Sequence, residues 1–343
     1  MSQLRKDPIS GRWVIIASER SKRPDDFRGA SEPKPEAPNT FCPFCAGNES
    51  KTPPEVYSLR RLGTRPDEEG WRVRVVPNKF PALDRGGKPE RFQKGVFESM
   101  SGTGVHEVVI ESPEHGVELG DLPLPHLREV LETFQARIVS IEHEQQYQYV
   151  QVFKNKGREA GASLSHPHSQ IVATPIIPKR VKEELYGGER LFKKYQECVF
   201  CRIIKQETAA RDRLIDLNKQ FCTLAPFAPR FPFEMQIYPL RHSAHFAEMD
   251  GDEVQALAAT LKTALLKLKG LLGDPPYNLV LHQAPNPGIS QGQWPGRSKD
   301  YHWHLEILPV LTRVAGFEYG TGFYINPVPP EAAAEFLSGQ KIN

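Results

Sequence analysis

The chain has 343 residues, of which 39% are hydrophobic and 25% are charged, and this composition is typical of a soluble globular protein with two domains of ordinary size. The 44 basic and 42 acidic residues leave a formal net charge of +2, so the composition gives no support for a nucleic-acid backbone or an anionic membrane as partner. Any phosphate binding must therefore depend on a local arrangement of side chains.

The sequence contains no pattern of a membrane span or an export signal. No apolar run approaches the roughly 18–20 residues that a membrane span needs, and the first residues, MSQLRKDPISGRW, lack the apolar core of a signal peptide. We therefore expect a cytoplasmic protein. Four of the five cysteines form two CxxC pairs, which in such a chain indicate metal binding or redox chemistry rather than a disulfide framework.

The first half of the chain predicts an irregular segment followed by strands and one helix. Residues 22–70 are rich in proline and charge, which is typical of an irregular excursion. Residues 71–78, 106–112 and 147–155 carry alternating β-branched residues and predict strands. Between the last two strands, residues 127–146 have apolar side chains at helical spacing, so we expect a helix with one face on a sheet.

The second half repeats this order of elements. Residues 233–242, 276–285 and 302–311 predict strands, and residues 252–273 predict a long helix whose acidic start suits a helix N-terminus. CPFC, SPEH, VFKNKG and HPHSQ of the first half recur in the same order as CVFC, PLRH, LHQAPNPG and HWHLE. The sequence therefore predicts a duplicated α+β unit.

We expect two lobes, residues 1–178 and residues 179–343, each with a mainly antiparallel sheet and one long helix packed on it. Residues 174–197 would form the connection between them, part helix and part linker.

Two sets of cysteines and histidines have the order expected of zinc sites. The two residues inside a CxxC pair let both thiolates converge on one tetrahedral metal ion, which needs two further ligands. Histidines in matching positions supply them in each half, and thiolate mixed with imidazole favours zinc. The predicted ligands are Cys42, Cys45, His115 and His166 in the first lobe, and Cys198, Cys201, His242 and His302 in the second. His245 is a competing ligand, and a redox pair is the alternative for either CxxC alone.

The segment GASLSHPHSQIVA, residues 161–173, places three polar side chains on one face of a predicted strand. Alternate residues of a strand share a face, so His166, His168 and Gln170 point the same way. With His166 held by zinc, His168 is fixed two residues along, and neutral imidazole is a good nucleophile towards phosphorus near pH 7. The amide of Gln170 cannot protonate a leaving group, so it favours one that departs as an anion, such as a sugar phosphate. These residues predict nucleotidyl transfer between two phosphates.

The CxxC pair, SPEH, NKG and HPHSQ together resemble the galactose-1-phosphate uridylyltransferases, a branch of the histidine triad superfamily, from Asp7 to Glu331. The resemblance implies two histidine-triad-like lobes and a ping-pong cycle in which His168 carries the nucleotidyl group and Gln170 contacts the phosphoryl group. It also implies a homodimer, and a nucleotide sugar and a sugar 1-phosphate as substrates. The two zinc ions, which the order of cysteines and histidines predicts, are interpreted as structural. The substrate-binding residues that it implies are Arg20, Arg23, Asn78, Asn155 and Ser163, with Phe317 and Glu318 of the tail reaching a partner's sugar site.

Three departures separate the chain from the usual uridylyltransferase pattern. Ser169 replaces the glycine of HPHGQ, Lys79 stands where the bacterial enzymes carry a ribose-binding aspartate, and the tail GFEYGTGFYINPVPPE differs. The tail, the second CxxC and HSQ are more similar to the plant ADP-glucose phosphorylase, which passes an adenylyl group from a histidine to inorganic phosphate. We place uridylyl transfer from UDP-glucose to a hexose 1-phosphate first, because the full HPHxQ pattern matches it, and the adenylyl reaction second.

The second lobe has no equivalent pair of catalytic residues. His304 lies at the position of the nucleophile, but Glu306 replaces the glutamine, so we interpret His304 as a structural or accessory-metal histidine. His282 is ambiguous, because the uridylyltransferases use a histidine at this place for a second metal site that contains no cysteines.

Two other classes of function are kept as alternatives. A histidine triad hydrolase or nucleotide-binding regulator would share the fold, but Gln170 removes the proton donor that hydrolysis of an amidate requires. A protein-interaction domain that is stabilised by zinc and has no catalytic activity would not explain a histidine beside a zinc ligand and two arginines near the start of the chain.

Overall fold

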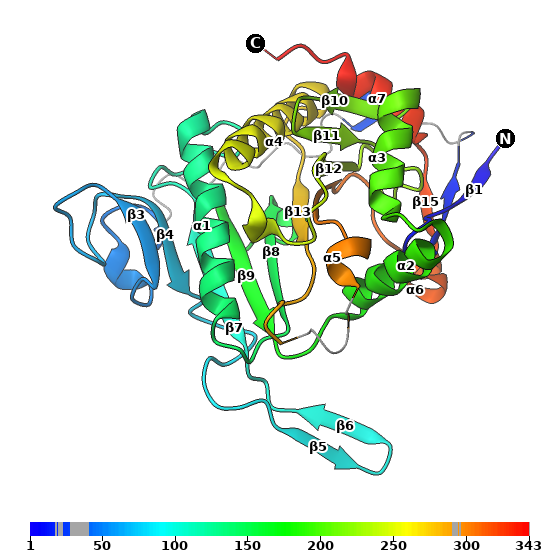
Figure 1. The fold of residues 1–343 in the computed structure, drawn as a ribbon. Helices are drawn as coiled ribbons and strands as arrows, with labels where there is room; N and C mark the ends of the chain where they lie inside the picture. The colour runs from blue at the N-terminus through cyan, green and yellow to red at the C-terminus, as the bar shows by residue number, and fades with distance from the viewer. Residues whose placement is uncertain (18, 20–22, 28–40, 290–293, 295, 343) are drawn as a thin grey trace.

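The computed structural model describes residues 1–343 apart from 18, 20–22, 28–40, 290–293, 295 and 343. Ten strands, five from each half of the chain, form its central sheet (Figure 1). The first half contributes β3 (Tyr57–Arg60), β4 (Trp71–Pro77), β7 (Val105–Ile110), β8 (Tyr149–Lys156) and β9 (His168–Thr174). The second half contributes β10 (Leu214–Leu217), β11 (Phe221–Leu224), β12 (Met235–Pro239), β13 (Tyr277–His282) and β14 (His304–Pro309).

The two halves of the sheet have the same strand order. From the outer edge inwards, the first half reads β3-β4-β7-β9-β8 and the second half reads β10-β11-β12-β14-β13. A long helix joins corresponding strands, α1 (Leu124–Glu142) between β7 and β8, and α4 (Gly251–Leu272) between β12 and β13. All neighbouring strands of this sheet are antiparallel. The predicted duplicated α+β fold is therefore confirmed.

The half-sheets of the two lobes are continuous with each other. β8 and β13, the inner strand of each half, pair antiparallel, and Asn155 lies opposite Asn278 in this seam. The Asn278 amide also donates a 2.8 Å hydrogen bond to the side-chain oxygen of Asn155. The pattern of each half predicts its own strands but not their pairing across the seam, because β8 and β13 are far apart in the chain. The boundary between residues 178 and 179 stays a prediction.

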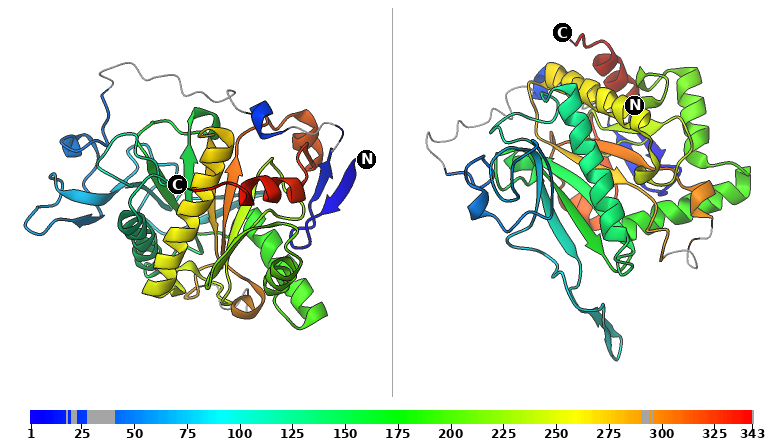
Figure 2. Two further views of the ribbon diagram at one scale, coloured as in Figure 1. Left: turned by 90° about the horizontal axis from the view of Figure 1, so that it is seen from above. Right: turned by 60° about the vertical axis from the view of Figure 1, so that its left-hand side comes forward.

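The two long helices lie side by side on one face of the sheet and share one apolar core with both lobes (Figure 2). α4 begins with a capping box, in which the Asp250 carboxylate accepts from the backbone of Glu253 and the Glu253 side chain accepts from the backbone of Asp250. Leu127 and Phe134 of α1 and Leu261 of α4 are among the buried core residues. Full burial of each such side chain stabilises the fold by roughly 1.5–3 kcal/mol. The packing of α1 and α4 therefore stabilises the sheet on this face.

Two further helices cover the opposite face of the second half-sheet. α2 (Lys179–Tyr195) and α3 (Val199–Ala210) pack on Cys222, Leu224 and Tyr238, which alternate along their strands with residues of the main core. The connection predicted over residues 174–197 is thus mostly helix α2. The second CxxC marks the start of α3, because Cys198 is its N-cap residue.

The chain termini form a small sheet at one end of the molecule. β1 (Gln3–Lys6) pairs antiparallel with β2 (Trp13–Ile16), which pairs parallel with β15 (Tyr324–Asn326). The C-terminal region also holds three helices, α5 (Arg297–Asp300), α6 (Gly316–Thr321) and α7 (Pro330–Ser338).

The region predicted as an irregular excursion contains short regular elements within its described residues. They are the single-turn 3-10 helices η2 (Pro24–Phe27) and η3 (Glu49–Lys51), followed by edge strand β3. A hairpin of β5 (Arg91–Lys94) and β6 (Phe97–Met100) projects from the body of the molecule (Figure 1).

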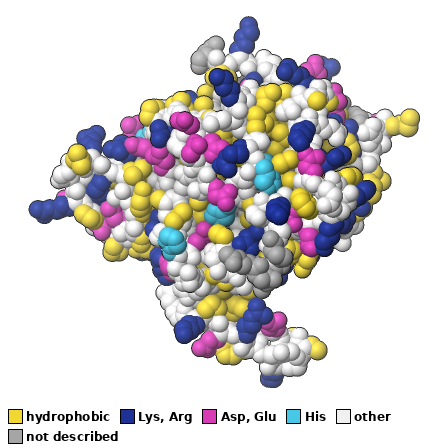
Figure 3. Space-filling view, viewed as in Figure 1, with side chains coloured by type: hydrophobic (Ala, Val, Ile, Leu, Met, Phe, Trp, Pro, Cys, Tyr) yellow, Lys and Arg dark blue, Asp and Glu magenta, His cyan; other side chains and the backbone are white. Residues whose placement is uncertain are grey.

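The surface shows no large region of a single charge on the face in Figure 3, where acidic and basic side chains are interspersed. Among the described residues, no helix has the length and apolar character that crossing a membrane requires.

Candidate active site

The structure brings together all four predicted ligands of the first metal site. The ligand atoms of Cys42, Cys45, His115 and His166 lie within 4.8 Å of one another. Cys45 Sγ is 3.3 Å from His115 Nδ1, and the Nδ1 of His166 is 3.6 Å from each of the two sulfur atoms. In a tetrahedral zinc site with ordinary bond lengths, sulfur and nitrogen ligands lie roughly 3.5 Å apart. The four side chains therefore have the spacing that such an ion needs.

The second set of predicted ligands is arranged in the same way. The ligand atoms of Cys198, Cys201, His242 and His302 also lie within 4.8 Å of one another. Cys201 Sγ is 3.3 Å from His242 Nδ1 and 3.6 Å from His302 Nδ1. The competing ligand His245 lies elsewhere, since its Nε2 is 2.8 Å from the carboxylate of Glu142.

Hydrogen bonds orient the nitrogen that faces the cysteines in three of these histidines. The Nε2 atoms of His166, His242 and His302 donate to backbone carbonyl oxygens at 2.8, 2.9 and 3.0 Å, respectively. A carbonyl oxygen only accepts, so the ring proton is on Nε2 and the lone pair of Nδ1 faces the cysteines. Burial lowers the pKa of His166 to about 4, which keeps its ring in the neutral form that binds metals.

His168 is the first residue of β9 and follows directly on the first metal site. His166 precedes β9, so the prediction that it lies on the same strand as His168 and Gln170 is wrong. Its ring nevertheless contacts Phe44, as the ring of His168 does. Pro167 lies between the two histidines and has no N–H group to continue the ladder. His168 and Gln170 do share a face, because they lie opposite Ile110 and Val108 of β7.

The ring of His168 is held with one nitrogen available for chemistry. Its Nδ1 donates a 2.8 Å hydrogen bond to the carbonyl oxygen of His166, so Nε2 carries the lone pair when the ring is neutral. Burial lowers the pKa of His168 below 6.5, which favours the neutral, nucleophilic form at pH 7. Phe44, inside the first CxxC, packs edge-on against this ring with 5.4 Å between the ring centroids.

Gln170 forms a cluster with two residues from neighbouring segments. Its Oε1 is 2.8 Å from Nε2 of His106 on β7, and the same nitrogen is 3.1 Å from the side-chain amide of Asn78, which follows β4. The structure thus joins a residue predicted to contact the phosphoryl group with one predicted to contact the ribose. His106 is the residue between them.

Buried charges support β9 from the face of the sheet that carries α1 and α4. Glu111 accepts hydrogen bonds from Ser169 Oγ at 2.6 Å and from Lys154 Nζ at 2.9 Å. All three side chains are buried. Burial acts to lower the pKa of Lys154, but its charge and hydrogen-bond interactions with Glu111 and Glu118 together outweigh burial and raise the pKa. The residue between His168 and Gln170 is therefore tied to β8 by a satisfied ion pair.

Four other residues were predicted to bind the substrate: Asn155, Ser163, Arg20 and Arg23. Lys154 pairs with Ser169, so Asn155 lies beside His168 on the neighbouring strand. Ser163 is exposed in the loop before β9. Arg23 is exposed just before η2, and Arg20 lies outside the described residues.

Phe317 and Glu318 belong to α6, which packs on β15. Phe317 contacts Phe323, and Glu318 accepts a hydrogen bond from the backbone of Ala315. Within the described part of the chain, no hydrogen bond, ion pair or ring contact joins them to His168 or Gln170.

The equivalent position of the second lobe holds an ion network instead of a free nucleophile. Like His168, His304 begins its strand, and its Nδ1 is 3.2 Å from the carbonyl oxygen of His302. It stacks on His282, with 4.7 Å between the ring centroids. Burial opposes protonation of His282, but the carboxylates of Glu184 and Glu306 at 3.0 and 3.1 Å outweigh it and raise its pKa to about 10.

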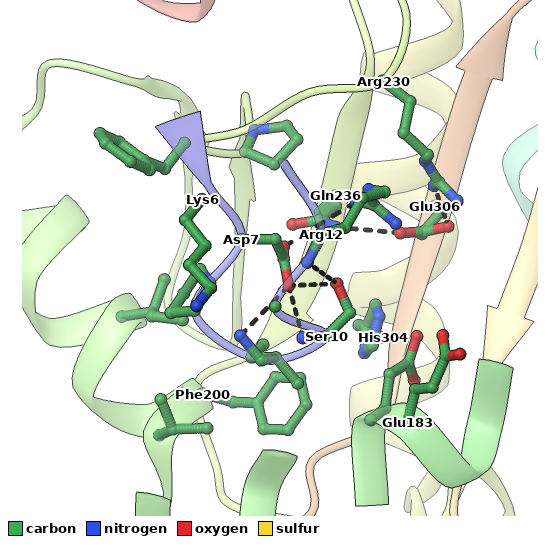
Figure 4. A pocket seen from close by; sticks show the side chains of 18 of the residues that line it. Lys6, Asp7, Ser10, Arg12, Glu183, Phe200, Arg230, Gln236, His304 and Glu306 are labelled. Carbon is green, nitrogen blue, oxygen red and sulfur yellow. Dashed lines mark hydrogen bonds and ion pairs between the residues drawn. The ribbon is translucent and has the colours of Figure 1, made fainter. Parts of the chain in front are cut away.

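A pocket of about 840 Å³ opens above this network (Figure 4). Arg230 and Glu306 both line the pocket, and Arg230 pairs with Glu306 and with Glu234. Glu184, His282 and His304 have the donor atoms for a metal ion, but His282 would first have to lose the proton that both carboxylates stabilise. The glutamate in place of Gln170 thus gives this pocket a different chemistry from that of the first lobe.

Comparison with known proteins agrees with this geometry. Residues 1–178 match the family model described as galactose-1-phosphate uridyl transferase, N-terminal domain. The chain belongs to the galactose-1-phosphate uridyl transferase family. A second model, a domain of unknown function, matches residues 126–339.

Two members of the family illustrate the range of its activities. The chain is 39% identical to the ADP-glucose phosphorylase of Arabidopsis thaliana, over 98% of this chain and 92% of the relative. It is 30% identical to the galactose-1-phosphate uridylyltransferase of Thermotoga maritima, over 100% of this chain and 99% of the relative. A crystal structure of the Arabidopsis ADP-glucose phosphorylase with bound ADP-glucose has a TM-score of 0.81 and 35% identity, with complete coverage of both chains.

Several residues of the site were not singled out from the sequence. His106 lies in a predicted strand, and its polar side chain among β-branched neighbours was a usable signal. Glu111 directly follows β7 and Lys154 lies on β8; both are buried, and their places in the sequence do not show that they pair. Glu184 comes from α2, and only the packing of that helix brings it to His282.

Proposed function

We propose that the protein is a nucleotidyltransferase that works through a nucleotidyl-histidine at His168. The observation that carries this proposal is the hydrogen bond from His168 Nδ1 to the carbonyl oxygen of His166, which leaves Nε2 as a nucleophile beside Gln170. A neutral imidazole fixed in this way needs no separate base before it attacks phosphorus.

The favoured donor is ADP-glucose, with inorganic phosphate as the acceptor. This choice is supported by the higher identity to the ADP-glucose phosphorylase, and by Ser169, the second CxxC and the tail, which depart from the uridylyltransferase pattern. Uridylyl transfer between UDP-glucose and a hexose 1-phosphate is the second candidate, since HPHSQ retains the proline of the uridylyltransferase motif. Both reactions share the same chemistry at His168.

The proposed cycle has two displacement steps at one phosphorus atom. In the first, His168 Nε2 forms a bond to the α-phosphorus while the bond to the bridging oxygen breaks, and glucose 1-phosphate leaves with the electron pair. In the second, an oxygen of inorganic phosphate attacks the same phosphorus and releases the imidazole, giving ADP. Gln170 donates hydrogen bonds to the phosphoryl oxygens, where charge develops in each transition state, and neither leaving group needs a proton.

Both cysteine–histidine clusters are proposed to hold zinc. The mixture of two thiolates and two imidazoles, with distances that suit a tetrahedral ion, supports this metal at each site. With all four positions taken by protein ligands, such an ion has a structural role. At the first site, the residues that would hold it also fix the backbone from which His168 extends.

We also propose that the enzyme is a homodimer. Phe317 and Glu318 do not join the His168 cluster in the described chain, so any contact with the sugar would come from the tail of a second copy. Sedimentation equilibrium at several protein concentrations tests this assembly. A monomer that retains full turnover would contradict it.

The function is tested by labelling the protein with donor nucleotides. The protein is incubated separately with ADP-glucose and UDP-glucose that carry a radiolabelled α-phosphate, and acid-labile, base-stable label on the protein is counted. We expect label from ADP-glucose in the wild type and none in His168→Ala. His304→Ala, which removes the equivalent histidine of the second lobe, is the matched control and should still be labelled.

Each outcome of this experiment has a defined meaning. Label from UDP-glucose alone would favour the uridylyl reaction. Steady release of free nucleoside monophosphate without an acceptor would indicate a hydrolase. A wild-type protein that takes no label from either donor would contradict the nucleotidyltransferase assignment.

A further inference from the structure

We propose that His106 is a positioning residue that turns the amide of Gln170 so that its NH₂ group faces the phosphoryl group. This inference rests on the proposed function, because Gln170 acts on a phosphoryl group only in that reaction. It starts from the contact between His106 Nε2 and Gln170 Oε1, which are 2.8 Å apart.

The surroundings of His106 fix which of its ring nitrogens carries the proton. The backbone N–H of Ala82 donates a 3.1 Å hydrogen bond to Nδ1, and a backbone N–H cannot change its role. Nδ1 is therefore the unprotonated nitrogen, and in the neutral ring Nε2 carries the hydrogen. His106 Nε2 thus donates to Gln170, and the Gln170 atom that faces it must be the oxygen.

This contact removes an ambiguity that every glutamine side chain has. The two ends of the amide have nearly the same shape, so packing alone does not decide which end faces the substrate. With its oxygen held by His106, Gln170 presents its NH₂ group on the other side, where it can donate to phosphoryl oxygens. In the reverse orientation, the amide oxygen would face those oxygens and repel them.

Asn78 belongs to the same arrangement. Its side-chain oxygen accepts a 2.9 Å hydrogen bond from the backbone of Phe80, which fixes the orientation of its own amide. Its NH₂ group lies 3.1 Å from His106 Nε2, and because Nε2 directs its own hydrogen to Gln170, this is a contact between two donors and not a hydrogen bond. The link from Asn78 to His106 is made by the backbone N–H of Asn78, which donates to the carbonyl oxygen of His106 at 2.8 Å. His106 therefore connects residues 78–82 to the catalytic strand and fixes the position of both predicted substrate contacts.

The second lobe makes a comparable connection with different residues. Val108 lies opposite Gln170 as Gln236 lies opposite Glu306, so the counterpart of His106 is Glu234. Glu234 reaches Glu306 through Arg230. In each lobe, the residue two positions after the histidine that begins the strand, Gln170 or Glu306, is thus bound from the equivalent neighbouring position. In the first lobe the group that binds it is a neutral donor, and the bound residue is an amide whose hydrogens remain available to the substrate.

The kinetic test uses two variants of His106 and one of Gln170. His106→Phe keeps a planar ring but removes the donor, and we expect the rate of nucleotidyl-histidine formation to fall about 10- to 100-fold with a much smaller change in KM. His106→Gln places an N–H donor near the position of Nε2 and should recover most of that loss. His143→Gln, at an exposed histidine after α1, is the control and should leave the rate unchanged.

A double-mutant cycle shows whether His106 acts through Gln170. In the Gln170→Ala background, His106→Phe should change the rate by less than about twofold, because the group that it positions is absent. Equal losses from His106→Phe in both backgrounds would overturn the proposal and assign His106 a general structural role.

The ring tautomer provides a test that does not depend on activity. Long-range ¹H–¹⁵N correlation spectra of the resting protein should show His106 with its hydrogen on Nε2 and an unprotonated Nδ1. The opposite tautomer would overturn the proposal. A wild-type protein that takes no label from any donor would contradict the proposed function alone, and the tautomer would still decide whether His106 orients Gln170.

Discussion

The hydroxyl of Ser169 donates a 2.6 Å hydrogen bond to the carboxylate of Glu111, which is completely buried beneath β9. Lys154 occupies the other carboxylate oxygen. Ser169→Ala leaves one oxygen of a buried charge without its donor, so we expect the free energy of unfolding to fall by about 1.5–3 kcal/mol. Urea unfolding measures this change, and Ser99→Ala on the exposed strand β6 should shift the value by less than about 0.5 kcal/mol.

Removal of one cysteine from either cluster should remove one metal ion. We expect two zinc ions per chain in the wild type and one in both Cys42→Ser and Cys198→Ser, because three remaining ligands hold zinc much more weakly than four. Elemental analysis by mass spectrometry measures the content. Cys222→Ala removes a buried cysteine outside both clusters and should retain two ions. Wild-type metal content in either serine variant would be evidence against that site.

Gln170 and Glu306 are the third residues of β9 and β14, and replacing each with the residue of the other lobe should lower activity only at Gln170. Gln170→Glu places a negative charge where Gln170 would donate to phosphoryl oxygens, so we expect nucleotidyl-histidine formation to fall about 100-fold or more. Glu306→Gln should leave that rate within about twofold, since Glu306 lies in the other lobe's network. Its cost should be in stability, about 3 kcal/mol, because Arg230 and His282 lose a buried partner. Labelling rates and urea unfolding measure the two effects.

An ion network between the chain ends should make stability depend on pH in the acid range. Glu331 of α7 accepts from Arg5 of β1 and from Arg213 before β10. Burial acts to raise the pKa of Glu331, but these two hydrogen bonds, a backbone hydrogen bond and the charge of Arg5 together hold the pKa below 4.5. A carboxyl group with a lowered folded-state pKa stabilises the fold above its unfolded pKa, and this contribution is lost as the pH falls through the folded value.

The substitution Glu331→Gln tests this linkage. At pH 7 it should lower the free energy of unfolding by about 1 kcal/mol, a modest value because Glu331 is partly exposed to screening solvent. The difference from the wild type should shrink as the pH falls below 4.5. Glu335→Gln, at an exposed position of the same helix, is the control. A difference that grows towards low pH would contradict the assignment.

The sequence was most informative where a function depends on residues close together or in a repeated order. Both metal clusters followed from CxxC pairs and from histidines that recur in the same order in each half. The shared face of His168 and Gln170 followed from strand alternation. The position of His166 was misjudged because Pro167 interrupts the ladder, so the strand starts two residues later than the pattern suggested.

The remaining features depend on which strands become neighbours. The contact between His106 and Gln170 needs β7 beside β9, and the two residues are 64 positions apart in the chain. The ion pair of Lys154 with Glu111 and the contact of Glu184 with His282 depend on packing in the same way. The spacing of residues within one strand or helix does not show which elements become neighbours, so these contacts could not be predicted from the sequence.

The seam between β8 and β13 has a consequence for the edges of the sheet. Without β13, β8 would be an edge strand of the first half-sheet, with unpaired backbone donors and acceptors open to any other extended chain. The pairing with β13 covers that edge, so each half of the molecule covers the inner edge of the other half.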